Sequence, residues 1–210
     1  MLRHGQTDLN RQRIIQGPRI DDALSELGLR QAERAADALH RVPLSAVYSS
    51  PLTRARQTAE LVARRQILAG SNAPMEVVPE LYEMDYGHLA GRPYHEAEPH
   101  LEQLRDAWRM GYLGESIPGG ESPILAQHRI RPFVEHVLEH AARRPVAVVG
   151  HGRINRVLLA TLTGYGLERM DEFPQANAAI TELEVEAGAA KLLRLNDTAH
   201  LDLAGDGLFA

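Results

Sequence analysis

The chain of 210 residues contains no cysteine, which excludes disulfides, thiolate nucleophiles and cysteine-ligated metals. No apolar run approaches the ~20 residues that cross a bilayer. The net charge of −5 argues against a nucleic-acid surface, because such surfaces owe most of their affinity to basic side chains. We therefore expect a cytoplasmic protein that has neither nucleic acid nor a membrane as a partner.

Strand and helix patterns alternate along the chain, whose 44% hydrophobic content suffices for one sizeable core. Apolar positions recur at three and four residues from Leu29 to Leu39, which predicts an amphipathic helix. Further helices are expected from Pro51 and from Gly152 to Gly164. Apolar runs predict strands at 46–48, 75–78, 146–149, 179–185 and 191–196. The pattern favours a single domain over 1–210, an α/β fold of three α/β/α layers in which helices flank a mostly parallel central sheet.

Two histidines stand beside glycines where predicted strands end. Arg3-His4-Gly5 follows a short first strand, and the apolar run 145–149 leads into Gly150-His151-Gly152. Ligands bind at the carboxyl ends of parallel strands in open α/β sheets, and glycines there let backbone amides approach an anion. We expect the two histidines to meet in one phosphate-binding crevice.

A third segment completes a pattern that resembles the histidine phosphatase superfamily, also called the phosphoglycerate-mutase-like family. The resemblance covers nearly the whole chain. An isolated Arg-His-Gly would be weak evidence, whereas several elements in the family's order are specific. These elements are Arg3-His4-Gly5, Asn10, Gln16-Gly17, Leu24-Ser25-Glu26-Leu27-Gly28, Tyr48–Ala59, Glu80-Leu81-Tyr82-Glu83, Gly119-Gly120-Glu121-Ser122, Gly150-His151-Gly152 and Asn177–Thr181.

The resemblance implies phosphoryl transfer through a phosphohistidine and assigns roles to individual residues. Such chemistry needs an in-line nucleophile, donors for the phosphoryl oxygens and an acid for the leaving oxygen. The implied catalytic residues are His4, Glu83 and His151; the phosphate contacts are Arg3, Asn10, Arg54 and the Gly152 amide; the substrate contacts are Gln16 and Gly17. Guanidinium groups match phosphate oxygens better than a lysine does, and two of them beside a covalent histidine make a metal or other cofactor unnecessary.

The acid has a rival three residues away. Glu80 directly follows Pro79 and would lie nearer the strand end, so we favour Glu83. In the family this glutamate protonates the leaving oxygen and then deprotonates the water that hydrolyses the phosphohistidine.

The family contains phosphatases, which transfer the phosphoryl group to water, and mutases, which return it to a second hydroxyl. Residues 84–120 interrupt the strand-helix order and form an insertion that we expect to shape substrate access. Mutases of the family carry a longer insertion with a proline-rich stretch and added basic residues, whereas this one supplies only Arg92, Arg105 and Arg109. We predict a phosphomonoesterase for a small phosphorylated metabolite.

Two alternatives stay open: a cofactor-dependent phosphoglycerate mutase, and a catalytically silent binding or regulatory module on the same fold. The complete catalytic set disfavours the second. A homodimer is compatible with the sequence. The pair His136 and His140 has a spacing that can bind zinc, but an exposed helix face is favoured because no third ligand is evident. Because only Met1 and Leu2 precede the first motif, we also expect residues upstream of Met1 in the natural chain.

Overall fold

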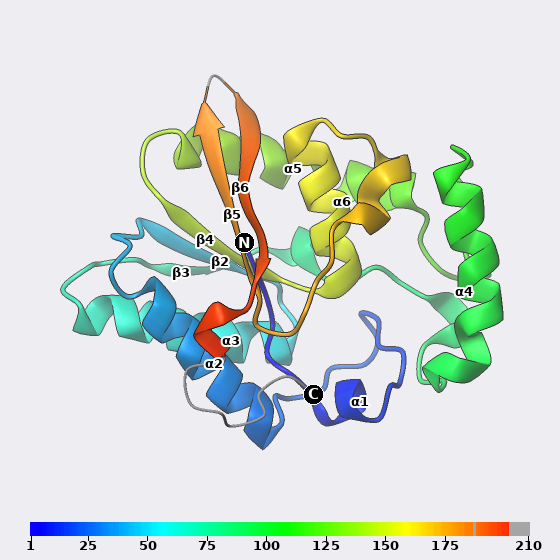
Figure 1. Cartoon of the computed structure of the whole chain (residues 1–210), viewed down its shortest axis with the longest axis horizontal. Coiled ribbons are helices and arrows are strands. Elements are labelled where there is room, and N and C mark those ends of the chain that lie inside the picture. The colour runs from blue at the N-terminus through cyan, green and yellow to red at the C-terminus, as the bar shows by residue number, and fades with distance from the viewer. Residues whose placement is uncertain (187, 202–210) are drawn as a thin grey trace.

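The computed structural model describes residues 1–186 and 188–201 and centres on a six-stranded sheet (Figure 1). The strand order is β3-β2-β4-β1-β5-β6. The first four of these strands are mutually parallel, whereas β5 is antiparallel to β1 and forms an antiparallel hairpin with β6. The prediction of a mostly parallel sheet is confirmed. The strand bounds are β1 Leu2–Arg3, β2 Ala46–Ser49, β3 Met75–Val77, β4 Val146–Gly150, β5 Ile180–Glu186 and β6 Ala189–Asp197.

Helices cover both faces of the sheet because successive strand side chains point to opposite sides. Helices α2 and α3 lie on one side of the sheet and α5 and α6 on the other (Figure 1). Val47 and Val149 pack into a core with α2 and α3, while Tyr48 and Val148 pack into a core with α5 and α6. This arrangement is the predicted three-layer sandwich. The helix bounds are α1 Asp8–Arg11, α2 Glu26–Leu39, α3 Thr53–Leu68, α4 Tyr94–Arg109, α5 Pro123–Ala141 and α6 Gly152–Thr163, with short 3-10 helices at Pro79–Leu81, Gly87–Leu89, Leu167–Glu172 and Ala199–Leu201.

Helix α2 differs from the predicted helix in the residue at which it begins and in the residues that it buries. It begins at Glu26, where Ser25 caps it by accepting a hydrogen bond from the Gly28 amide at 3.0 Å. Leu29, expected on the buried face, is 40% exposed, because the buried face of α2 consists of Gly28, Gln31, Ala32, Ala35 and Ala36 and Leu29 lies at its edge. Gly28 instead touches Gly5, and a Cβ on Gly5 would lie 2.3 Å from the Gly28 carbonyl oxygen. Because neither position has room for a side chain, the two glycines allow the backbone of α2 to pack directly against the loop that carries His4.

The insertion of residues 84–120 contains α4, which stands at the side of the molecule, apart from the sheet (Figure 1). Its Ala97 and Leu101 join a small separate core with Ile15, Leu89 and Ile117. The insertion is thus joined to the loop after β1. No helix within the described ranges has the length and apolar character needed to cross a membrane.

Candidate active site

A cavity of about 550 Å³ lies beyond the carboxyl ends of β1 and β4. Its walls come from the loop after β1, from the starts of α3 and α6, and from the insertion. This is the position at which open α/β sheets bind ligands. The lining residues include seven of the nine predicted site residues, namely Arg3, His4, Asn10, Gln16, Arg54, Glu83 and Gly152.

His4 is held rigidly although the strand before it is short. Its amide donates to the Gly150 carbonyl at 3.0 Å, and its own carbonyl accepts from the Ala178 amide at 3.2 Å. The ring Nδ1 lies 2.6 Å from the Gly5 carbonyl oxygen. Because a carbonyl only accepts, Nδ1 carries the proton and Nε2 keeps its lone pair. This tautomer presents Nε2 as a nucleophile.

The surroundings of His4 also keep it neutral. Burial, followed by the charges of Arg54 and Arg3, holds the pKa of His4 well below its usual range. An uncharged imidazole is the form that can attack phosphorus.

His151 lies beside His4, with the two ring centroids 5.1 Å apart. Its Nε2 is 2.6 Å from the Ser50 hydroxyl, and its Nδ1 is buried without a hydrogen-bond partner among the described residues. A serine hydroxyl can donate to Nε2, which leaves the proton on Nδ1 as a free donor. Burial and the Arg54 charge lower the pKa of His151 well below its usual range, so the ring is neutral at neutral pH.

Arg3 and Arg54 complete a ring of donors. Arg54 is fully buried and donates from Nη1 to the Ile20 carbonyl at 2.9 Å, while its Nε and Nη2 have no partner among the described residues. Arg3 donates from Nη1 to the Gln175 carbonyl at 2.5 Å, and its Nε is likewise buried and unpartnered. Burial lowers the pKa of Arg3 to about 10, which leaves it cationic at neutral pH. Buried donors of this kind cost about 1–3 kcal/mol each without an acceptor, and an oxyanion supplies several acceptors at once.

The carboxylate of Glu83 lies against the amino-terminal turn of α6. Its Oε1 accepts from the amides of Met84 at 2.8 Å and Ile154 at 2.9 Å, and its Oε2 accepts from the Arg153 amide at 3.0 Å. Oε2, with a single protein donor, retains a lone pair that can carry a proton. The rival Glu80 is not among the residues that line the cavity, so position favours Glu83.

The remaining predicted site residues differ in their placement. Asn10 accepts from the Thr7 amide at 3.1 Å, and Gln16 donates to the Thr7 hydroxyl at 2.8 Å while its Oε1 has no partner in the described chain. Gly152 lies against Arg3, whose Cζ would be 3.7 Å from a Cβ there. Gly17 is not brought to the cavity, because it faces the backbone of residues 84–86.

Two supporting residues escaped sequence reasoning about the site. Ser50 holds His151, and Asn177 donates to the His4 carbonyl and to Asn10 Oδ1, both at 3.2 Å. The signal for Ser50 is its place two residues after the predicted strand 46–48, at the end of β2. Asn177 belongs to an element that carries the resemblance, but its residue type is equally typical of a turn, so the sequence assigns it no role.

The segment Gly119–Ser122, one of the elements that carry the resemblance, does not line the cavity. Its Glu121 forms a two-pronged ion pair with Arg129, at 2.6 and 2.8 Å. Arg129 also lies over the Tyr82 ring, 3.6 Å from its centroid, and donates to the Tyr82 carbonyl at 3.2 Å. Glu121 therefore helps to fix the segment that carries Glu83.

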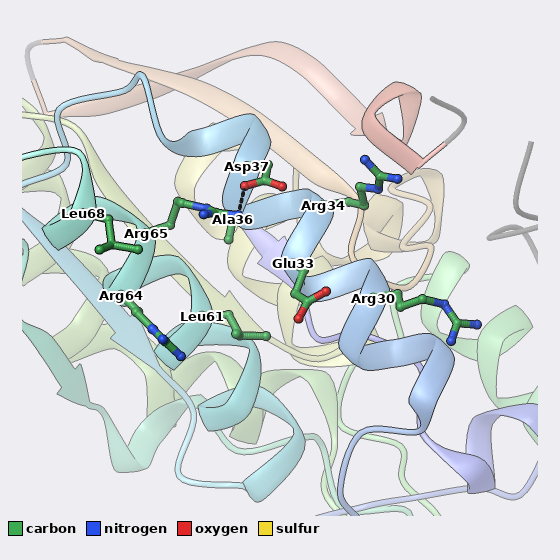
Figure 2. A pocket seen from close by; sticks show the side chains of 9 residues that line it. All are labelled: Arg30, Glu33, Arg34, Ala36, Asp37, Leu61, Arg64, Arg65 and Leu68. Carbon is green, nitrogen blue, oxygen red and sulfur yellow. Dashed lines mark ion pairs between the residues drawn. The ribbon is translucent and has the colours of Figure 1, made fainter. Parts of the chain in front are cut away.

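A second hollow of about 430 Å³ lies between α2 and the later turns of α3 (Figure 2). Arg65 reaches across it to Asp37 in an ion pair. Its α3 residues begin seven positions after Arg54, which corresponds to about 10 Å along a helix. Among the described residues that line this hollow there is no histidine or other candidate nucleophile, so the cavity at the strand ends remains the candidate active site.

The family model described as histidine phosphatase superfamily (branch 1) matches residues 1–198. The chain belongs to this superfamily. The family predicted from the motifs is thus confirmed. A probable phosphoglycerate mutase GpmB of Yersinia pestis (strain Pestoides F) is 31% identical over 208 residues, covering 97% of this chain and 94% of that protein.

Solved structures of phosphatases have the same fold as this chain. A mycobacterial glucosyl-3-phosphoglycerate phosphatase is 30% identical with a TM-score of 0.78, over 94% of this chain and 97% of that one. The α-ribazole phosphatase from Shigella flexneri is 25% identical with a TM-score of 0.77, over 93% and 94% of the two chains. Relatives of this chain therefore carry the names of both phosphatases and a mutase.

Proposed function

We propose that the chain is a phosphomonoesterase that hydrolyses a small phosphorylated metabolite through a phosphohistidine on His4. The observation that carries the proposal is the set of buried, unpartnered donors on Arg3, Arg54 and His151 around a histidine whose Nε2 is free to attack. An oxyanion with several acceptor oxygens satisfies all of these donors together.

In the first step, the Nε2 lone pair of His4 attacks phosphorus and the bond to the leaving oxygen breaks. A proton on Glu83 Oε2 passes to that oxygen, so the product departs as an alcohol. Arg3, Arg54 and His151 stabilise the charge that spreads over the equatorial oxygens.

In the second step, water attacks the phosphohistidine and the nitrogen-phosphorus bond breaks. The Glu83 carboxylate takes a proton from the water, which restores its acid form for the next cycle. Inorganic phosphate leaves, and His4 returns to the tautomer fixed by the Gly5 carbonyl.

Mutase activity is the alternative, supported by the name of the Yersinia relative. The shorter insertion and the phosphatase names of the solved relatives support hydrolysis instead. Two products measured in one reaction separate the phosphatase from the mutase. With 3-phosphoglycerate and its bisphosphate primer, we expect release of inorganic phosphate at a rate far above the formation of 2-phosphoglycerate. Interconversion of the phosphoglycerates faster than phosphate release would overturn the assignment in favour of a mutase.

Independence from metal is part of the proposal, because two guanidinium groups already neutralise the phosphate dianion. We expect p-nitrophenyl phosphate hydrolysis at an unchanged rate in EDTA, and a loss of activity that added Mg²⁺ restores would refute this point. A cytoplasmic location, a homodimer and the role of residues 84–120 in substrate access stay predictions.

A further inference from the structure

The segment that carries Glu83 contacts one arginine that lies outside the cavity. Arg129 belongs to α5 and is not among the residues that line the cavity, so it has no direct contact with a bound substrate. Its side chain is nevertheless only 12% exposed, as is that of its partner Glu121. A buried ion pair is weak evidence for stability, because the loss of hydration offsets the attraction between the charges. The place of this pair beside Glu83 indicates another role.

The guanidinium group of Arg129 makes three kinds of contact. Nε and Nη2 donate to the two carboxylate oxygens of Glu121, at 2.8 and 2.6 Å. Nη1 donates to the backbone carbonyls of Glu80 and Tyr82, the second at 3.2 Å. The group also lies over the Tyr82 ring, 3.6 Å from its centroid. A planar group with several fixed N–H donors can make all of these contacts together, whereas the ammonium group of a lysine cannot.

These contacts fix the backbone directly before Glu83. The Tyr82 carbonyl and the Glu83 amide belong to one planar peptide unit, so a hydrogen bond to that carbonyl sets the orientation of the backbone at Glu83. The 3-10 helix that precedes this unit, Pro79–Leu81, has only three residues. A single helical turn gains too few hydrogen bonds to be stable alone. The segment therefore depends on tertiary contacts such as those of Arg129.

Glu121 extends the same support to the residues after Glu83. It directly follows the insertion of residues 84–120, and its amide donates to the Asp85 carbonyl at 2.8 Å. Asp85 lies two residues after Glu83 in the chain. Arg129 thus holds the backbone on one side of Glu83 itself, and through Glu121 it is joined to the backbone on the other side.

The carboxylate of Glu83 is fixed separately, by amides of the first turn of α6. Oε2, which carries the proton in the proposed reaction, accepts from the Arg153 amide at 3.0 Å. General acid catalysis needs this oxygen within about 2.6–3.2 Å of the leaving oxygen, and a displacement of about 1 Å can lower the rate about 10²-fold. The direction in which Oε2 offers its proton therefore depends on where the backbone of Glu83 is held.

We propose that Arg129, oriented by Glu121, is a positioning residue that holds Glu83 in the geometry required to protonate the leaving oxygen. The inference rests on the proposed function and deepens it, because Arg129 acts on the reaction only through Glu83. It distinguishes Arg129 from Arg3 and Arg54, whose donors face the phosphoryl group and act whatever the leaving group is.

The variant that tests this role removes both charges at once. Replacement of Arg129 alone would leave the Glu121 carboxylate buried without its partner, which is strongly destabilising. Glu121→Leu/Arg129→Met replaces the pair with apolar side chains, a change that buried ion pairs often tolerate. The matched control is Glu139→Leu/Arg143→Met, which removes an exposed ion pair near the end of α5.

The measured quantity is the dependence of kcat/KM on the leaving group, which a general loss of structure would not change. We expect Glu121→Leu/Arg129→Met to lower kcat/KM for glycerol 3-phosphate by about 10–100-fold, because its leaving oxygen needs a proton. p-Nitrophenyl phosphate, whose leaving group departs as an anion, should lose less than about threefold. The control variant should change neither value by more than about twofold.

Combination with Glu83→Gln tests whether the ion pair acts through Glu83. Once residue 83 cannot donate a proton, its position no longer affects that transfer. Adding Glu121→Leu/Arg129→Met to Glu83→Gln should therefore lower kcat/KM for glycerol 3-phosphate by less than about a further threefold. Independent roles would instead give losses that multiply.

The outcomes separate this inference from the proposed function. Equal losses for both substrates in Glu121→Leu/Arg129→Met, or losses that multiply with Glu83→Gln, overturn the positioning role and leave a phosphatase. If that variant does not fold, Arg129→Lys decides, because it keeps the charge beside Glu121 and loses the planar donors. It should lose more activity toward glycerol 3-phosphate than toward p-nitrophenyl phosphate, and equal losses or none overturn the role. Hydrolysis of neither substrate by the wild type overturns the proposed function as well.

Discussion

Replacement of Glu83 by glutamine tests the proton donor. The carboxylate accepts three backbone N–H groups, two at Oε1 and one at Oε2. A glutamine oxygen in the Oε1 position keeps the bonds from Met84 and Ile154, whereas its NH₂ group would face the Arg153 amide, another donor. One hydrogen bond is lost, which should lower the free energy of unfolding by about 1–3 kcal/mol and leave the fold intact.

The catalytic effect should depend on the leaving group. General acid catalysis contributes about 10²–10⁴-fold, so Glu83→Gln should lower kcat/KM for glycerol 3-phosphate by that factor. p-Nitrophenol leaves as an anion without a proton, so its phosphate ester should lose less than about tenfold. The value of kcat/KM reports the steps up to formation of the phosphohistidine, which excludes the later attack by water.

Glu80→Gln is the matched control, because Glu80 lies three residues away and does not line the cavity. It should change kcat/KM for neither substrate by more than about twofold, because the half-buried Glu80 lies outside the cavity. Equal losses for both substrates in Glu83→Gln would refute proton donation by Glu83. A larger differential loss in Glu80→Gln would transfer the role to Glu80.

Three further predictions follow from the contacts of the site. Ser50→Ala should lower kcat/KM by roughly tenfold, because His151 loses the 2.6 Å contact that sets its tautomer. His151→Ala should lower kcat/KM by about 10²-fold, because a donor to the phosphoryl oxygens is removed. Equal kcat/KM for Ser50→Ala and the wild type would contradict the role of Ser50 in orienting His151. Arg54→Lys should lower kcat/KM by about 10²-fold with an unchanged circular dichroism spectrum, since an ammonium cannot supply both Nε and Nη2 donors, and full activity would contradict it. The pKa values of His4 and His151 are lowered in the folded protein, so below pH ~6.5 the unfolded chain binds protons that the native state does not. The free energy of unfolding should therefore be highest above pH 6.5. As the pH falls from 6.5 toward the pKa values of the two histidines in the folded protein, it should decrease by up to about 2.7 kcal/mol per pH unit, about 1.36 for each histidine. Urea denaturation that gives the same free energy of unfolding at pH 7.5 and pH 5.5 would contradict this.

The meeting of His4 and His151 in one site could be predicted, because the ends of buried strands can be recognised in the sequence. His4 and His151 each follow an apolar run, and the parallel pairing of β1 with β4 brings such ends to one edge of the sheet. Arg54 and Glu83 were placed through the ordered motifs, since nothing in their own periodicity distinguishes them from surface residues.

The charge of the outer cavity could not be predicted in the same way. The sequence singles out only the arginines of residues 84–120, because no pattern around Arg13, Arg153 or Arg156 indicates that these residues line a cavity. Their orientation depends on tertiary contacts, such as the shared carboxylate of Asp171 and the backbone bonds from Tyr94 to Arg13. Similarly, the exposure of Leu29 depends on which face of α2 packs against the rest of the protein, and the start of α2 at Glu26 lies before the predicted start at Leu29.

Trapping of the covalent intermediate tests the central claim most directly. The wild-type protein is mixed with a ³²P-labelled phosphomonoester, quenched within milliseconds, and its acid-labile, base-stable label is mapped by peptide. We predict label on the peptide that contains His4, at up to one phosphate per chain, and neither label nor turnover in His4→Ala. Acid-labile label of similar stoichiometry in His4→Ala, or turnover by that variant at a rate near the wild type, would contradict the account.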